Sequence, residues 1–192
     1  MRISSGKYKG RKIGTGKLFP GSGSTSDLRP TPAKVREAIF DILRDLAEGA
    51  SFLDLYAGSG AIGFEAASRG AARVTFVESV RPRADAIRKA VEAIGVTAGT
   101  EVHCADAGMF LRKASGAGDR YDIVFADPPY GSEEIGKVLP LIAEYGILDA
   151  GGVLLAEHAR KKQVPERVGS LMRMKQYRYG DTMLSLYRNE EC

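Results

Sequence analysis

The stretch SFLDLYAGSGAIG, residues 51–63, decides the fold of this chain. Its first six residues are mostly apolar, which favours a short buried strand. Gly58, Gly60 and Gly63 then follow the spacing G-x-G-x-x-G, which permits a tight turn, close approach of a ligand to the backbone and close packing of the next helix. The sequence therefore predicts a strand, a glycine-rich turn and a helix reaching to about Arg69, the opening unit of a doubly wound α/β sheet.

The segment after this unit supplies an acid where a nucleoside ligand needs one. A second predicted strand, residues 73–77, ends at Glu78, about twenty residues beyond the turn, where a carboxylate can hold both hydroxyls of a ribose. A helix over residues 82–94 and a strand over residues 101–104 follow. Asp106, just after that strand, is a candidate partner for an adenine amine, although single acids at strand ends are also common in solvated positions.

The remaining pattern completes an α/β sheet. We predict a helix over residues 32–48 with Thr31 as its cap, because apolar residues recur there at helical spacing. A buried strand over residues 121–126, a helix over residues 133–145 and a strand over residues 153–157 follow. The tail, residues 171–187, reads as strand, tight turn and strand. We therefore expect a Rossmann-like sheet of seven strands, mostly parallel, that ends in an antiparallel hairpin.

Asp127-Pro128-Pro129-Tyr130 follows the buried strand at residues 121–126. Two prolines remove two backbone donors, so the carbonyls of Asp127 and Pro128 are available to a ligand. A carboxylate, a free carbonyl and an aromatic ring suit a flat base with an exocyclic amine: the oxygens accept its N–H groups and Tyr130 stacks on its face. The alternative is that the prolines only end the strand and Tyr130 packs on the surface.

Composition excludes several classes of protein. With 192 residues and 44% hydrophobic content, the chain supports one folded unit with a small appendage. No apolar stretch reaches the length of a membrane span and no apolar signal segment follows the amino terminus, so we expect a cytoplasmic protein. Cys104 and Cys192 give neither a disulfide framework nor metal-ligand spacing, and the isolated His103 and His158 favour packing over metal binding. We expect no metal.

The net charge of +4 is unevenly distributed. Residues 1–30 carry seven Lys or Arg against one acid, residues 160–178 again seven against one, and the remainder is acidic. This pattern favours a polyanion held by the basic ends. In the predicted amino-terminal hairpin the cations surround one aromatic, an arrangement typical of RNA binding; the residues concerned are Lys7, Tyr8, Lys9, Arg11 and Lys12. Solvated, flexible termini are the alternative.

Taken together, these motifs resemble a known enzyme family. Residues 54–63, Glu78 and residues 127–130 are similar to class I S-adenosylmethionine-dependent methyltransferases that modify exocyclic amines. Residues 2–12, 28–37 and 179–182 further resemble the bacterial 16S ribosomal RNA guanine-N2 methyltransferases, the family named for guanine 966. The chain departs from that family at Ser4-Ser5, where Ile-Gly is usual, and at Pro32-Ala33.

The resemblance implies a division of labour along the chain. Residues 1–30 would be a basic RNA-binding extension and residues 31–192 the methyltransferase domain. The cofactor would be S-adenosylmethionine, held by Asp54, Ala57, Gly58, Ser59, Gly60, Glu78, Asp106, Arg29 and Thr31. Asp127, Pro128 and Tyr130 would hold the target amine. The partner would be 16S ribosomal RNA, either alone or within a partly assembled small subunit. The enzyme would be a monomer.

Three other readings stay open from sequence. Adenine-N6 methylation of DNA or RNA is the nearest, because residues 127–130 can hold either amine. An NAD-dependent dehydrogenase also fits the glycine turn and Glu78, but it leaves residues 127–130 and the basic ends unexplained. A non-catalytic RNA-binding assembly factor would retain the same fold.

Overall fold

The computed structural model describes residues 1–14, 32–129 and 133–190. Its helices are α1 (Ala33–Leu43), the 3₁₀ turn η2 (Arg44–Ala47), α2 (Ala61–Ser68), α3 (Arg81–Ile94), α4 (Ala107–Ala117) and α5 (Glu134–Glu144). Its strands are β1 (Ser51–Asp54), β2 (Arg73–Glu78), β3 (Thr100–Cys104), β4 (Tyr121–Ala126), β5 (Leu148–Ala159), β6 (Arg167–Val168), β7 (Leu171–Tyr179) and β8 (Thr182–Asn189).

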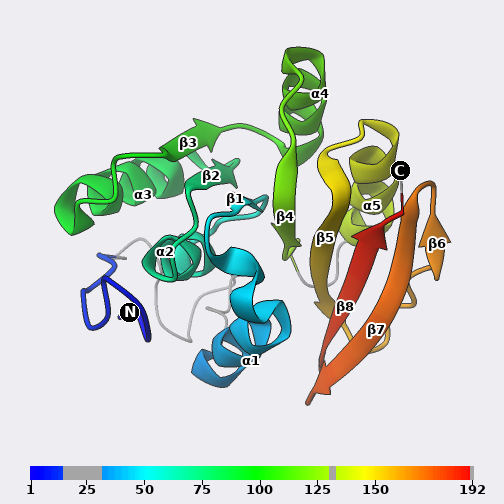
Figure 1. Ribbon diagram of the computed structural model, residues 1–192, viewed down its shortest axis with the longest axis horizontal. Helices are drawn as coiled ribbons and strands as arrows, with labels where there is room; N and C mark the ends of the chain where they lie inside the picture. Colours follow the sequence, from blue (N-terminus) through cyan, green and yellow to red (C-terminus); the bar gives the residue numbers. More distant parts are fainter. Residues whose placement is uncertain (15–31, 130–132, 191–192) are drawn as a thin grey trace.

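All these strands form one sheet in the order β3-β2-β1-β4-β5-β8-β7-β6 (Figure 1). Strands β1 to β5 pair in parallel, whereas β8 joins β5 antiparallel and continues into β7 and β6. The strand order reverses between β1 and β4, which are direct neighbours. Ligands of doubly wound sheets bind at the carboxyl ends of the strands beside such a reversal.

Helices cover both faces of the sheet and bury two apolar cores. One core joins Ile39 of α1, Phe64 of α2 and Ile87 of α3 to the sheet. The other joins Leu111 of α4 and Leu139 of α5 to the opposite face. Because the central strands are buried on both faces, they are nearly continuous apolar runs, as parallel strands require.

The glycine-rich turn between β1 and α2 takes the form that its sequence predicts. Gly60 precedes α2 with a φ of 76°, in the left-handed region, and a Cβ there would lie 2.8 Å from the Phe64 ring. Gly63 lies inside α2, where a Cβ would overlap the ring of Phe76 on β2. Side chains at these positions would therefore push α2 away from the sheet.

The predicted fold is confirmed, with two differences in detail. The described residues form eight strands where seven were expected, because the two-residue β6 pairs with the start of β7. Helix α4 was not predicted, although its buried residues Ala107, Phe110, Leu111 and Ala114 recur at helical spacing. Its start is set by Asp106, whose side chain accepts hydrogen bonds from the N–H groups of Gly108 and Met109.

The amino-terminal segment packs against the sheet domain. It closes as a small loop through one antiparallel bridge between Arg2 and Lys12, and Ile3 and Ile13 are buried in the core beside α1 and α2. In Figure 1 this loop lies at the opposite end of the molecule from the hairpin of β7 and β8. Residues 1–14 are therefore far from the basic segment of residues 160–178, with the central strands between them.

Candidate active site

A pocket opens at the carboxyl ends of the central strands. The glycine turn, the end of β2, the start of α4 and the segment after β4 all contribute to it. Its lining comprises Leu55, Tyr56, Gly58, Val77, Glu78, Ser79, Arg83, Ala105, Asp106, Ala107, Asp127 and Pro129. Four residues predicted from three separate motifs, Gly58, Glu78, Asp106 and Asp127, therefore line one pocket.

Glu78 connects the end of β2 to the glycine turn. One carboxylate oxygen accepts the N–H of Gly58 at 2.9 Å, and the other accepts the N–H of Val80 at 2.7 Å. Arg83, at the start of α3, lies 3.8 Å from the same carboxylate. These contacts fix the carboxylate at the pocket wall, and lone pairs remain on both oxygens for the hydroxyls of a ribose.

Asp54, the last residue of β1, stabilises the glycine-rich turn from its buried side. It is 1% exposed and accepts the N–H of Gly63 at 3.0 Å, so it joins the end of β1 to the first turn of α2. Burial is the main cause that raises the pKa of Asp54 to about 7; the N–H of Gly63 opposes this rise and the nearby charge of Glu78 adds to it. A cation bound in the pocket would favour the ionised form of this carboxyl.

Asp127 directly follows β4 and is partly buried. Its pKa is raised well above the ordinary value, first by burial, then by the charge of Glu157 and last by that of Asp54. Pro128 is buried, whereas Pro129 is exposed and lines the pocket. The carboxylate of Asp127 therefore faces the same space as the glycine turn, in acidic surroundings that suit a positively charged ligand or transition state.

Sequence analysis missed Tyr56, which also lines the pocket. Burial, and then the charges of Glu134 and Asp106, raise the pKa of its phenol. Within the described part of the chain the buried Tyr56 hydroxyl has no hydrogen-bond partner. Buried polar groups are nearly always paired, so this hydroxyl points to a polar ligand that completes the site. An aromatic directly after a strand and before the turn was the signal available in the sequence.

The other predicted residues are distributed as follows. Ala57, Ser59 and Gly60 form the turn beside Gly58, and Ala57 and Gly60 are buried. Asp106 is exposed and uses one oxygen to cap α4, which leaves its other oxygen for a ligand. Arg29, Thr31 and Tyr130 lie outside the described residues. His158 is buried and bonded to Ser185 at 2.8 Å, in line with a packing role.

The amino-terminal cations lie on the loop of residues 1–14, on the side of α2 and α3 (Figure 1). Lys7 and Arg11 lie 5.4 and 5.6 Å from the centre of the Tyr8 ring. Arg11 also donates to the carbonyl of Ile94, at the end of α3, at 2.5 Å. Lys9 and Lys12 are exposed, so the loop presents a basic surface built around one aromatic ring.

Glu65 of α2 anchors this loop. It is 1% exposed and accepts hydrogen bonds from the N–H and hydroxyl of Ser4 and from the N–H of Ser5. Arg36 and Arg69 form ion pairs with it at 3.9 and 3.4 Å. Ser4-Ser5, where the chain departs from the resembled family, thus gains a structural explanation, because the Ser4 hydroxyl supplies one of these bonds.

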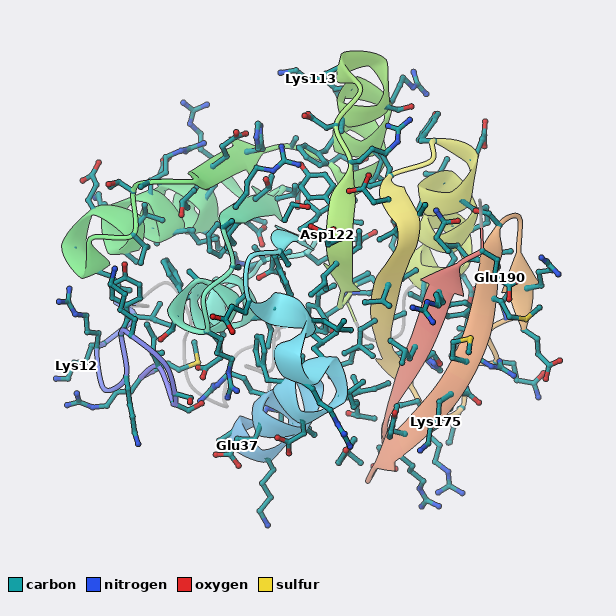
Figure 2. All side chains as sticks on the ribbon, in the orientation of Figure 1. Lys12, Glu37, Lys113, Asp122, Lys175 and Glu190 are labelled. Carbon is teal, nitrogen blue, oxygen red and sulfur yellow. The ribbon has the colours of Figure 1, made fainter. Side chains whose placement is uncertain are left out.

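A second basic surface lies at the carboxyl-terminal hairpin. Figure 2 shows Lys175 on β7, at the far end of the molecule from Lys12. Lys175 lies 4.9 Å from the centre of the Tyr177 ring. Nearby, Arg160, Lys162 and Arg173 line a shallow hollow, and Lys162 pairs with Glu133 at the start of α5. This second surface therefore adjoins the segment that follows Asp127.

The described residues show neither a metal site nor a membrane span. They contain no group of three or more His, Cys, Asp or Glu side chains placed to hold a metal ion. None of their helices has both the length and the apolar content that a bilayer crossing requires.

Several known proteins are similar to this chain over nearly its whole length. The YlbH protein of Bacillus subtilis, provisionally named an rRNA methyltransferase, is 34% identical over 98% of both chains. Ribosomal RNA small subunit methyltransferase D of Escherichia coli is 30% identical over 99% of this chain and 90% of its own. A solved Escherichia coli structure, yhhF, provisionally named a methyltransferase, has a TM-score of 0.82 at 30% identity and covers 100% of this chain and 99% of its own.

A more distant solved structure has the same fold. The RNA methyltransferase of Salinibacter ruber, in complex with S-adenosyl-L-homocysteine, is 20% identical, covers 85% of this chain and 95% of its own, and has a TM-score of 0.64. The fold is therefore that of the S-adenosylmethionine-dependent methyltransferases. The model of the family described as "Conserved hypothetical protein 95" matches residues 1–188. The resemblance predicted from sequence is thus confirmed, and the chain belongs to this family of methyltransferases.

Proposed function

We propose that this protein transfers a methyl group from S-adenosylmethionine to the exocyclic N2 amine of a guanine in 16S ribosomal RNA. The observation that carries the proposal is the single pocket lined by Gly58, Glu78 and Asp127. The family and the names of relatives that act on small-subunit ribosomal RNA support the substrate class.

In this proposal the methyl donor occupies the side of the pocket near the glycine turn. Glu78 holds the ribose hydroxyls, Asp106 binds the adenine amine through its remaining oxygen, and the backbone of residues 57–60 receives the methionine part. The donor supplies an activated methyl group on a cationic sulfonium. The acidic surroundings fit such a ligand, because acids stabilise a nearby cation. The buried Tyr56 hydroxyl, which has no hydrogen-bond partner among the described residues, offers the ligand a polar contact.

The target guanine enters beside Asp127. Its N2 lone pair is delocalised into the ring, so the amine is a weak nucleophile until acceptors on its N–H bonds favour a more tetrahedral nitrogen. The Asp127 carboxylate and the Pro128 carbonyl are the proposed acceptors, and Tyr130 the stacking partner. Alignment of nitrogen, methyl and sulfur supplies the remaining rate gain. The base must leave any base-paired RNA helix to enter the pocket beside Asp127.

The two basic surfaces would hold the RNA on either side of the pocket. Lys7, Tyr8, Lys9, Arg11 and Lys12 form the amino-terminal contact in this proposal, and residues 160–178 the second. Phosphate contacts of this kind position the nucleic acid without reading its sequence. We further propose a cytoplasmic monomer that acts on 16S RNA within a partly assembled small subunit.

Mass spectrometry of 16S RNA nucleosides tests this function. RNA from cells without the gene should lack N2-methylguanosine at one position, and the wild-type gene should restore it, whereas an Asp127→Ala gene should not. Loss of N6-methyladenosine instead would replace guanine by adenine as the substrate. Full restoration by Asp127→Ala would show that methyl transfer does not need the Asp127 carboxylate.

A further inference from the structure

Glu157, which sequence analysis did not single out, lies beside Asp127 on the next strand. Ala126 of β4 pairs with Ala156 of β5 in parallel register, so Asp127 and Glu157 follow as neighbours. Phe125 and Leu155, two residues earlier, both face the core beneath α1 and α2. Side chains alternate along strands. Asp127 and Glu157 therefore point to the same face, from strands about 4.8 Å apart.

Glu157 is more deeply placed than Asp127. Its relative exposure is 2%, and among the described residues the pocket lining includes Asp127 but not Glu157. A carboxylate in this position acts on the neighbouring acid and not on the substrate. Buried acids are rare in proteins, because the loss of hydration is costly, so a second acid behind the reactive one calls for a role.

The groups that face Asp127 in the described structure are acidic. Glu157 approaches from β5 and Asp54 from β1, and each raises the pKa of Asp127 in addition to the effect of burial. Glu78, on β2, acts in turn on Asp54. The cation next to this group, Arg83, pairs with Glu78. Asp127 is thus held in surroundings that favour uptake of a proton.

We propose that Glu157 is a positioning residue that makes Asp127 the acceptor of the proton released when guanine N2 is methylated, an inference that rests on the proposed function. The N2 lone pair forms the new bond to the methyl carbon as the carbon–sulfur bond breaks, and that bond's electron pair stays on sulfur. The amine, now cationic, loses one N–H proton to an Asp127 oxygen, and its electron pair returns to nitrogen. Asp127 later releases the proton to water.

The acceptor role requires ionised Asp127 with a high proton affinity. Removal of the Glu157 charge weakens that affinity, since two unit charges at this separation interact strongly even when well screened. Glu157→Gln should therefore lower the acid midpoint of the pH–rate profile by about one pH unit or more. Glu157→Asp keeps the charge and should keep the midpoint. Asp149→Asn, an exposed position at the other end of β5, is the matched control.

Two measurements test the inference. The first follows the ¹³C signal of the Asp127 carboxyl with pH, assigned by its loss in Asp127→Asn; the second is the pH profile of single-turnover methyl transfer to 16S RNA. Both midpoints should fall in Glu157→Gln and stay in Asp149→Asn. A merely structural role of Glu157 would lower the rate at every pH and leave both midpoints unchanged, which would overturn the inference.

The design separates this inference from the proposed function. If the wild-type protein methylates 16S guanine and neither midpoint moves in Glu157→Gln, only the role of Glu157 is wrong. If the wild-type protein transfers no methyl group to 16S RNA, either alone or within a partly assembled small subunit, the proposed function is wrong, and the proton-acceptor role falls with it even when the carboxyl titration shifts.

Discussion

The acidic centre and the basic ends of this molecule use charge in opposite ways. At the centre, Asp54, Glu78 and Glu157 are buried and their charges act on one another or on Asp127 at short range. At the ends, Lys9, Lys12 and Lys175 are exposed to solvent. Buried charges are weakly screened, whereas exposed ones are screened by salt. Single substitutions should therefore have large effects at the centre and small, salt-dependent effects at the ends.

The largest effect is expected at Asp127. Asp127→Asn keeps the size of the side chain but removes the charge that faces the target amine, so methyl transfer should fall by about 10²–10³-fold. Affinity for S-adenosylhomocysteine should change little, because other residues hold the cofactor. Single-turnover transfer and isothermal titration calorimetry give the two values. Transfer within a factor of about three of wild type would remove Asp127 from the proposed chemistry.

Substitution of Glu78 should have the next largest effect, and this effect is on the binding of the cofactor. Glu78→Gln weakens two acceptors that hold the turn and would hold a ribose, so affinity for S-adenosylhomocysteine should fall by about 10–100-fold. Glu92→Gln, at an exposed position on α3, should leave the affinity unchanged. Calorimetry on the two variants side by side is the measurement. Equal affinity in both variants would place the ribose elsewhere.

Asp54 should reveal the cost of the acidic centre to stability. Because its pKa in the folded state is about 7, above the ordinary 3.8, the folded protein keeps a proton that the unfolded chain has lost between these values. Wild-type stability should thus fall as pH rises from about 4 to 7. Asp54→Asn retains an acceptor for Gly63 and removes this fall, with a gain on the order of 2 kcal/mol at pH 8.

Urea unfolding of wild-type protein and Asp54→Asn at pH 4 and pH 8, without cofactor, measures this difference. The gain should be present at pH 8 and absent at pH 4. An equal difference at both values would show that packing, and not the charge of Asp54, separates the two proteins.

The basic end should give the smallest effect for each residue. Replacement of Lys7, Lys9 and Lys12 by alanine should weaken binding of a 16S RNA fragment by about 1 kcal/mol per contact at most, and should reduce the slope of log K against log salt by about 2. The same triple change should leave cofactor affinity unchanged. Lys113→Ala on α4, labelled in Figure 2, is a control for the loss of an exposed charge. An unaltered slope would contradict an RNA contact at this loop.

The comparison of centre and ends also explains what the sequence could predict. Residues 51–63 encode their turn locally, because Gly60 needs a positive φ and Gly63 needs the absence of a side chain against Phe76. The carboxyl-terminal hairpin was equally local, with Gly180-Asp181 at its turn. Both features follow from short-range chemistry, and the structure confirms both.

Features that depend on the pairing of strands or on contacts between distant residues could not be predicted from the sequence. Glu157 looked like one acid among many, and only the pairing of β4 with β5 places it beside Asp127. Glu65 likewise gave no signal, since its partners Ser4 and Ser5 lie about sixty residues away in the chain. Helix α4 was missed because Asp106 was interpreted only as a ligand, whereas it also caps that helix.

The most direct test of the shared pocket is a crystal structure with an S-adenosyl group covalently joined to guanosine N2, a mimic of the transfer geometry. We predict that the Asp127 carboxylate lies within hydrogen-bond distance of N2 and that Glu78 binds the ribose of the adenosyl part. A structure in which the guanine binds away from Asp127, while the adenosyl part occupies the pocket, would contradict the account.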